Sequence, residues 1–294
     1  MTAGALALVL LSAFLHAAWN AAAKGSGDPA PFVFVADATA LCLLVPVLFL
    51  FRWADLTPEV WLMVLATGAI HGVYAWGLTR AYESGELTLV YPISRSTPAF
   101  VPFLAVPLLG ERVTAGGALG IALVLAGVWL VSTNARLAGE RLLTPELRFA
   151  YLTLGATVAY SLVDKRAMDL LDRNPWTGPA PRAVVYYVLL CASYLPFFYL
   201  LARRRLDAGA VRRTLTGRTL AVLSVVAASF LSYTLILQAM RTAPVSYVVA
   251  ARQSSVVFAV GLAMWWLRER PTRARLVGAA LTVAGVATIG LAGG

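Results

Sequence analysis

Charged residues are scarce in this sequence of 294 residues. Asp, Glu, Lys and Arg make up 13% of it, whereas soluble domains carry about 25%. Hydrophobic residues make up 60%, and the mean hydropathy is +0.77. This composition excludes a water-soluble protein and predicts an integral membrane protein. The net charge of +10 lies at the ends of apolar segments, so we expect lipid head groups as its partners and no nucleic acid.

Residues that usually carry catalytic or metal chemistry are also few. The two cysteines, Cys42 and Cys191, fall inside apolar segments and indicate neither a disulfide framework nor a metal site. Two histidines, His16 and His71, are too few for most metal centres. Nucleophile-elbow, zinc-helix and phosphate-loop motifs are missing. We therefore expect no enzyme, cofactor or metal, with a membrane-embedded enzyme, channel or scaffold as the alternative.

Long apolar segments dominate what is present. A membrane crossing needs about 20 mostly apolar residues, and lipid offers no partner for unpaired backbone groups, so each crossing must be a helix. Ten segments fit, at roughly 3–23, 30–51, 59–80, 87–109, 114–133, 148–168, 182–202, 218–240, 246–267 and 273–292. The predicted fold is an all-α integral membrane protein with ten transmembrane helices.

The sequence also contains an internal repeat. Ala81 to Thr133 aligns without a gap on Ala239 to Leu291 after a shift of 158 residues, and Ser96 meets Ser254. The two copies lie five predicted crossings apart, so the second runs through the bilayer in the opposite direction. We therefore predict two inverted five-helix repeats, 1–137 and 138–294. Inverted repeats are typical of transporters that open one central site to either side in turn.

Five passages resemble the drug/metabolite transporter superfamily, in its ten-helix EamA branch. They are His16-Ala17-Ala18-Trp19-Asn20 with Lys24, Tyr91-Pro92-Ile93-Ser94-Arg95 running on to Pro98, Gly110-Glu111-Arg112-Val113-Thr114, Tyr160-Ser161-Leu162-Val163-Asp164-Lys165, and Arg268-Glu269-Arg270-Pro271-Thr272. The resemblance covers the whole chain. It implies ten helices, cytoplasmic termini and a central cavity for small metabolites. Members of that branch export amino acids, including aromatic ones, or other small compounds.

Two arginines lie within the apolar segments, where ionisable groups are costly and often functional. Arg95 falls in the fourth segment and Arg252 in the ninth, one residue out of the repeat register. We expect both to present guanidinium groups to a substrate carboxylate, which they can bind as a bidentate fork. The alternative is a structural ion pair with Asp37 or Asp164.

Other polar and aromatic residues extend this predicted substrate site. The first segment carries a polar stripe of His16, Trp19, Asn20 and Lys24 at helical spacing, which must face protein or water. His16 and Asp37, interpreted as the only acid in the middle of a crossing, are the candidates for proton coupling, with His71 as a second histidine. The residues expected to contact substrate are Trp19, Asn20, His71, Tyr74, Tyr91, Arg95 and Arg252.

The prolines of the fourth segment and the Glu-Arg pairs between helices are expected to have structural roles. Pro92 and Pro98, followed by Pro102 and Pro107, remove backbone donors and predict an interrupted fourth helix. A kink that serves packing alone is the alternative. The pairs Glu111-Arg112 and Glu269-Arg270 fall in tight turns, where we expect them to fix the turn geometry.

These features together predict a secondary transporter. We expect an exporter of small amino-acid-like or aromatic metabolites in the bacterial cytoplasmic membrane, acting as a monomer by alternating access. An exporter of organic cations or drugs is the alternative, and it would need an unpaired carboxylate. The orientation has two interpretations: loop charges place both termini outside, whereas the resemblance implies cytoplasmic termini.

Overall fold

The computed structural model describes residues 1–23, 29–84, 87–133, 142–265, 268 and 270–292, without the side chains of 19–23, 29, 82–84 and 87–88. Over these ranges the chain consists of α-helices, short 3₁₀-helices and connections. Seven helical stretches are long and apolar enough to cross a membrane: Ala30–Phe49, Pro58–Ala81, Ala115–Thr133, Arg182–Ala202, Thr219–Met240, Val245–Trp265 and Arg273–Ala292.

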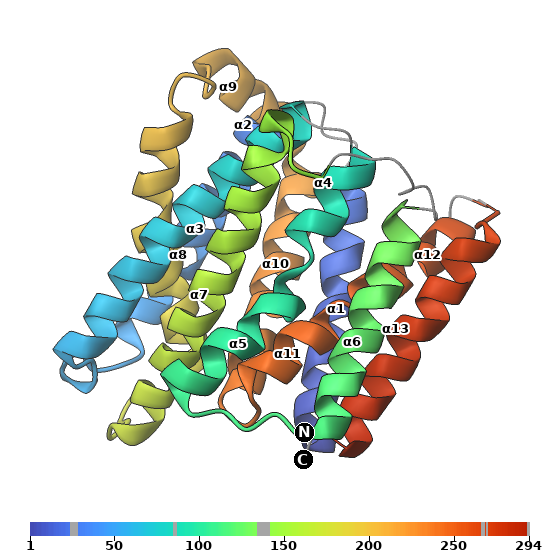
Figure 1. Cartoon of the computed structure of the whole chain (residues 1–294). Helices are drawn as coiled ribbons and strands as arrows, with labels where there is room; N and C mark the ends of the chain where they lie inside the picture. The colour runs from blue at the N-terminus through green and yellow to red at the C-terminus, as the bar shows by residue number, and fades with distance from the viewer. Residues whose placement is uncertain (24–28, 85–86, 134–141, 266–267, 269, 293–294) are drawn as a thin grey trace.

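The helices stand side by side in one bundle, and both chain ends lie at the same end of it (Figure 1). The first half contains α1 (Ala3–Ala23), α2 (Pro29–Leu44), η1 (Val45–Phe49), η2 (Trp53–Asp55), α3 (Pro58–Ser84), α4 (Leu87–Ser94), α5 (Thr97–Leu109) and α6 (Ala115–Thr133). The second half contains η3 (Pro145–Leu147), α7 (Arg148–Arg173), α8 (Arg182–Ala202), α9 (Ala208–Gly217), α10 (Thr219–Met240), α11 (Val245–Arg252), α12 (Ser255–Trp265) and α13 (Arg273–Ala292).

The repeat seen in the sequence reappears in the helix boundaries. The end of α4 at residue 94, shifted by 158, gives residue 252, where α11 ends. The start of α5 at residue 97, shifted by 158, gives residue 255, where α12 begins. Each half therefore contains a short helix, a break and a second helix in the same register. The predicted interruption of the fourth segment is present, and the ninth segment is interrupted in the same way.

Glycines show how the equivalent helices α6 and α13 are oriented. A Cβ atom added to Gly120 would lie 2.8 Å from the carbonyl oxygen of Gly285, and one added to Gly127 would lie 2.5 Å from that of Gly278. Rising numbers on α6 thus meet falling numbers on α13, so the two helices are antiparallel. Only glycine permits this approach of two backbones. Because α6 and α13 are repeat equivalents, their antiparallel contact relates the halves by inversion.

The largest differences from the predicted boundaries are at the end of α7 and in the segment 203–217. Helix α7 continues to Arg173, beyond the expected end at 168, because its polar last turns are paired with neighbouring helices. The segment 203–217, predicted as a connection, contains α9. Its N-terminus is capped by Asp207, whose carboxylate accepts a hydrogen bond from Ala210 N at 3.0 Å. Val211 of α9 packs against a buried cluster on α2 and α10, which stabilises the short helix.

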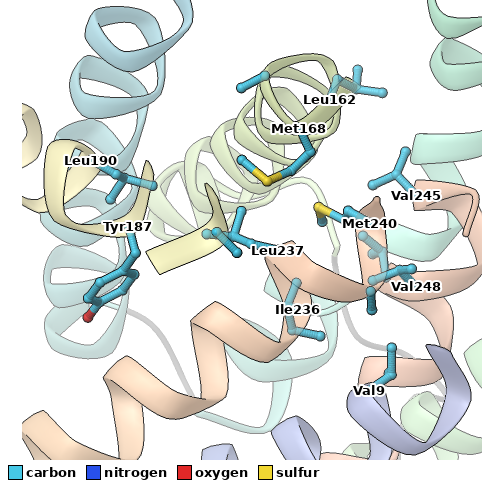
Figure 2. Close-up of a cluster of buried hydrophobic side chains, with 14 of the residues drawn as sticks. Val9, Leu162, Met168, Tyr187, Leu190, Ile236, Leu237, Met240, Val245 and Val248 are labelled. Atoms are coloured by element: carbon cyan, nitrogen blue, oxygen red, sulfur yellow. The ribbon is translucent and has the colours of Figure 1, made fainter. Parts of the chain in front are cut away.

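The apolar core joins both halves. Figure 2 shows part of it, where Val9 of α1 approaches Val248 of α11 and Ile236 of α10. Leu162 and Met168 of α7 close the same cluster from the other side. The core therefore gives the helices fixed neighbours around the polar side chains described below.

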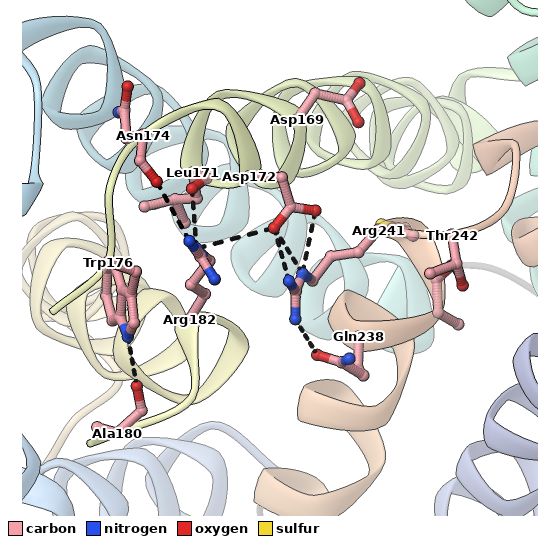
Figure 3. Close-up of polar contacts among 12 residues, drawn as sticks. Asp169, Leu171, Asp172, Asn174, Trp176, Ala180, Arg182, Gln238, Arg241 and Thr242 are labelled. Atoms are coloured by element: carbon pink, nitrogen blue, oxygen red, sulfur yellow. Dashed lines mark hydrogen bonds and ion pairs between the residues drawn. The ribbon is translucent and has the colours of Figure 1, made fainter. Parts of the chain in front are cut away.

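One rim of the second half is held by an ionic cluster (Figure 3). Asp172 at the end of α7 pairs with Arg241 after α10 at 2.7 Å and with Arg182 at the start of α8 at 3.8 Å. Arg182 also donates to the carbonyl oxygen of Leu171 at 2.9 Å. This cluster ties three helix ends together, and its partly exposed position indicates a structural role.

Candidate functional site

The two broken helices meet in the interior, where α11 packs against α5 and α1. Arg95 lies in the first break and donates from Nη2 to Nε2 of His16, 3.0 Å away on α1. Because a guanidinium group only donates, His16 accepts at this nitrogen. The Arg95 guanidinium also lies over the ring of Tyr91, 5.1 Å from its centroid. The structure thus brings three of the predicted site residues together.

Arg252 ends the short helix of the second break. Its guanidinium carbon lies 5.4 Å from the centroid of the Tyr233 ring on α10, a cation–π arrangement. Within the described ranges it has neither a hydrogen bond nor an ion pair, although it is only partly exposed. The charges of Arg95 and Arg252 both act on His16. A concentration of positive charge therefore lies between α1 and the two breaks.

Buried oxygen atoms without hydrogen-bond partners gather at the same breaks. Among the described side chains these are Ser94 Oγ, Gln253 Oε1, Ser254 Oγ and Ser255 Oγ, all in or beside a break. The first half differs at one of these positions, because Ser96 accepts a hydrogen bond from Trp129 Nε1 at 2.8 Å. Its equivalent Ser254 lacks this donor, since residue 129 shifted by 158 is Ala287. The second break therefore offers more unsatisfied acceptors than the first.

A second polar cluster surrounds Asp164, which is fully buried on α7. Its carboxyl group accepts from Thr67 Oγ1 at 2.6 Å, Tyr186 Oη at 2.8 Å and Tyr233 Oη at 2.5 Å. His71 Nε2 lies 3.0 Å from the same Tyr233 hydroxyl. Tyr233 therefore touches both polar clusters, with its hydroxyl on Asp164 and its ring face on Arg252.

Aromatic rings line this second cluster. The His71 ring stacks on Tyr160 with centroids 4.0 Å apart, and Tyr74 meets Tyr160 edge to face at 5.5 Å. Tyr194 donates a hydrogen bond to Asp37 at 2.8 Å, on the neighbouring helix α2. His71 and Tyr74 thus lie with the Asp164 cluster rather than beside Arg95, and both acidic groups have hydroxyl partners.

Some predicted site residues cannot be placed in this way. Trp19 and Asn20 belong to α1, but their side chains lie outside the described residues, as do Lys24 and Glu269. Pro92 lies inside α4 and Pro98 in the first turn of α5, so both flank the first break. The roles of all these residues stay predictions.

Glu111 makes a contact between the repeats. Its carboxylate accepts a hydrogen bond from the backbone nitrogen of Val245, and from Ser246 N at 3.2 Å and Ser246 Oγ at 2.6 Å. It therefore caps the first turn of α11 and fixes the helix that carries Arg252. Arg112 and Arg270 are exposed.

Sequence reasoning missed the Asp164 cluster as a site. The interpretation of Asp37 as the only mid-crossing acid was wrong, because α7 runs to Arg173 and places Asp164 well inside the helix. The sequence did mark Asp164, because it belongs to one of the passages that resemble the transporter family, Tyr160 to Lys165. Thr67, Tyr186 and Tyr233 had no such signal, because nothing in their local sequence shows that three separate helices converge.

Two pockets open between helices of the described ranges, and the predicted substrate residues line neither of them. One of about 500 Å³ lies between the ends of α3 and α8 and is lined by Trp76, Arg80, Leu201, Arg204 and Arg205. The other, of about 290 Å³, lies between α2 and α9 and is almost entirely apolar. His16, Arg95 and Arg252 are partly exposed.

Comparisons with known proteins agree with this architecture. One solved structure, titled "Crystal structure of protein", matches 99% of this chain and 98% of its own, with a TM-score of 0.74 and 17% sequence identity. At that identity the likeness shows the fold alone. None of the curated proteins matches this chain. The sequence profile of the EamA-like transporter family matches residues 3–133 and 174–291. These two blocks cover most of the chain and both repeats, so the predicted resemblance is confirmed and the chain belongs to the EamA-like transporter family of membrane transporters.

Proposed function

We propose that this chain is a secondary transporter that exports small amino-acid-like or aromatic metabolites across a bacterial cytoplasmic membrane. The observation that carries the proposal is Arg252. Within the described ranges its guanidinium group has neither a hydrogen bond nor an ion pair, and a charge held on an aromatic face inside a helix bundle is costly unless an anion binds it. A substrate carboxylate supplies that anion, and guanidinium binds carboxylate in a bidentate fork.

The remaining groups of an amino acid also find complementary chemistry here. Arg95 adds a second positive charge beside His16. The unpartnered oxygens of Gln253 and Ser254 are acceptors suited to a substrate ammonium group. The rings of Tyr91 and Tyr233, which lie against the two arginines, offer apolar surface for a side chain.

An exporter of organic cations is less consistent with these contacts. Such a substrate needs an acidic group that is available to it. Asp37 is occupied by Tyr194, and Asp164 accepts three hydroxyl donors. The positive charge around His16 would also repel a cation.

The proposed alternating-access cycle uses ten crossings. Besides the seven long apolar stretches, the helices α1, the broken pair α4 and α5, and α7 complete the count. Helix α7 has 26 residues, about 39 Å at 1.5 Å per residue, which is enough to span a bilayer. An even number of crossings places both chain ends on the same side of the membrane. This agrees with Figure 1, where both chain ends lie at the same end of the bundle. Both repeats belong to one chain, so a monomer suffices.

Transport in this proposal follows from the inverted halves. The two repeats rock about their broken helices and expose the arginine site to one side at a time. We expect no nucleotide to drive the cycle, so uphill movement draws on an ion or substrate gradient. The partners are the small-molecule substrate and the lipid bilayer.

Counterflow in proteoliposomes tests the proposal. Radiolabelled L-phenylalanine and L-threonine serve as carboxylate probes, and tetraphenylphosphonium as the cationic probe. We expect exchange of at least one amino acid, and loss of that exchange in both Arg95→Ala and Arg252→Ala at normal protein abundance. Arg275→Ala, which removes an exposed arginine, is the matched control. Unchanged exchange in the Arg95 and Arg252 variants would remove the arginines from the site, and exchange of the phosphonium alone would favour the cation exporter.

A further inference from the structure

The Asp164 cluster contains an unusual set of hydrogen-bond partners. Three hydroxyl groups from three helices converge on one carboxyl group: Thr67 of α3, Tyr186 of α8 and Tyr233 of α10. His71 adds two contacts to the same hydroxyls. Its Nε2 lies 3.0 Å from Tyr233 Oη. Its Nδ1 lies 3.0 Å from Thr67 Oγ1 and 2.9 Å from the carbonyl oxygen of Thr67.

The hydrogens in this network can be counted. Each hydroxyl group has one hydrogen to donate, and a carboxylate can only accept. When Asp164 is a carboxylate, the hydrogens of its three hydroxyl partners are therefore all committed to it. Every atom that faces the His71 ring nitrogens is then an acceptor. His71 must donate from both nitrogens, and this requires the protonated imidazolium form.

A second arrangement uses the same number of hydrogens. His71 passes the proton on Nε2 to Tyr233 Oη, while the hydroxyl proton of Tyr233 moves to Oδ2 of Asp164. Asp164 is then a carboxylic acid that donates to Tyr233 Oη, and Tyr233 donates to the neutral His71 ring, which keeps its hydrogen on Nδ1. All contacts remain satisfied in both arrangements. Removal of the proton leaves the network one hydrogen short, so two acceptors face each other in one contact.

We infer that Asp164, Tyr233 and His71 form a proton-binding site that holds one exchangeable proton, with the Tyr233 hydroxyl as the relay between the other two. The shared proton is what satisfies every contact of a buried polar cluster, where an unsatisfied group is costly. The site is distinct from His16, whose Nε2 already accepts from Arg95.

Neighbouring groups decide how readily this proton leaves. The titratable and charged side chains that face the pair come from four helices: Tyr74 of α3, Tyr160 of α7, Tyr186 and Tyr194 of α8, and Arg252 of α11. With its proton the Asp164–His71 pair is neutral overall, and without it the pair carries one negative charge. Arg252, on the face of the Tyr233 ring, stabilises that negative charge. The position of Arg252 therefore favours release of the proton.

Loss of the proton has a structural consequence. Thr67 and His71 belong to the first repeat, whereas Asp164, Tyr186 and Tyr233 belong to the second. The network is thus a hydrogen-bonded connection between the repeats, and deprotonation breaks one of its contacts. If the chain is a transporter as proposed, this change helps the repeats to move apart during transport, and this step rests on the proposed function. The proton site itself does not, since it depends only on the hydrogen-bond geometry.

The small number of histidines allows a direct test without any substrate. The chain contains two histidines, so His16→Gln leaves His71 as the single reporter in ¹⁵N spectra of the protein in nanodiscs. Infrared spectra report the carboxylic acid form of Asp164, assigned by its loss in Asp164→Asn. Both signals are followed between about pH 4 and pH 10. We expect the nitrogen and carboxyl signals to change in one step with a common midpoint.

Two tyrosine variants test whether Tyr233 relays the proton or only donates a hydrogen bond to Asp164. Tyr233→Phe keeps the ring under Arg252 and removes the relay, so we expect the two signals to separate into steps at least one pH unit apart. Tyr186→Phe removes another donor to Asp164 that does not touch His71, so the common step should move but remain single. Separate midpoints in the unsubstituted network, no titration of either signal, or an unchanged titration in Tyr233→Phe would each overturn the inference. A failure to export amino acids would leave these measurements unaffected.

Discussion

The broken helix of the first half contains four prolines, whereas its counterpart in the second half contains none within α11 or α12. Both nevertheless break at equivalent residues, 94 and 252. In the second break the nitrogens of Gln253 and Ser254 donate to carbonyl groups only three residues back, each at 3.0 Å. The first break has the same kind of turn, because Ser96 N donates to the carbonyl oxygen of Ile93 at 3.0 Å. The position within the repeat, rather than proline, therefore determines where the helix breaks.

The two breaks also differ in the residues that they present. The first has Ser94, Arg95 and Ser96, and the second has Arg252, Gln253 and Ser254. A displacement of one residue turns a side chain by about 100° around a helix. This difference directs Arg95 towards His16 of α1 and Arg252 towards Tyr233 of α10. The inverted halves thus share a backbone and build two different chemical environments.

The largest effect is expected where the halves are most alike. Gly127→Leu and Gly285→Leu each drive a side chain into the backbone of the opposite helix, 2.5 Å from Gly278 O and 2.6 Å from Gly120 O. We expect both to destabilise the protein by similar amounts, about 3 kcal/mol or more, measured by thermal unfolding in detergent. Gly155→Leu is the control, since its added Cβ meets nothing within 4 Å. Unequal effects of the two variants would contradict a symmetric contact between α6 and α13.

An intermediate effect is expected where the arginine registers differ. The double substitution Arg252→Ser with Gln253→Arg gives the second break the Ser-Arg-Ser sequence of the first. The guanidinium then leaves the face of Tyr233, so amino-acid counterflow should fall between about 10-fold and 100-fold, the range for a lost charged hydrogen bond. The fold should be retained, because composition at the break barely changes. Full activity would show that the register of Arg252 does not matter to the site.

The smallest effect is expected at the serine pair. Trp129→Phe removes the donor to Ser96 and makes the first break resemble the second. We expect a loss of about 0.5 to 1.5 kcal/mol in unfolding free energy, the usual contribution of one hydrogen bond. Trp265→Phe, which changes a side chain that is 80% exposed, should have no effect. An equal loss in both variants would show that ring size rather than the hydrogen bond is responsible.

Much of the fold could be predicted from the sequence because its signals are periodic or repeated. Apolar length predicted the seven stretches that are long and apolar enough to cross a membrane. The shift of 158 residues aligned the helices of the two halves. Arg95 and Arg252 could be selected because a charge within an apolar segment is visible without any structure. The end of α7 was predicted too early, since its last turns are polar and are stabilised by partners such as Met240, whose carbonyl oxygen accepts from Lys165 Nζ at 2.7 Å.

By itself, the sequence determined that the chain lies in a membrane, that it is built from two related halves, and which residues are too polar to face lipid. The tertiary structure decided which of these residues meet. Thr67, Asp164 and Tyr233 are far apart in the chain and carry no shared local pattern, yet they lie within hydrogen-bond distance. The physical reason is that hydropathy is a property of each segment, whereas a hydrogen bond between helices depends on rotation and depth, which only packing fixes.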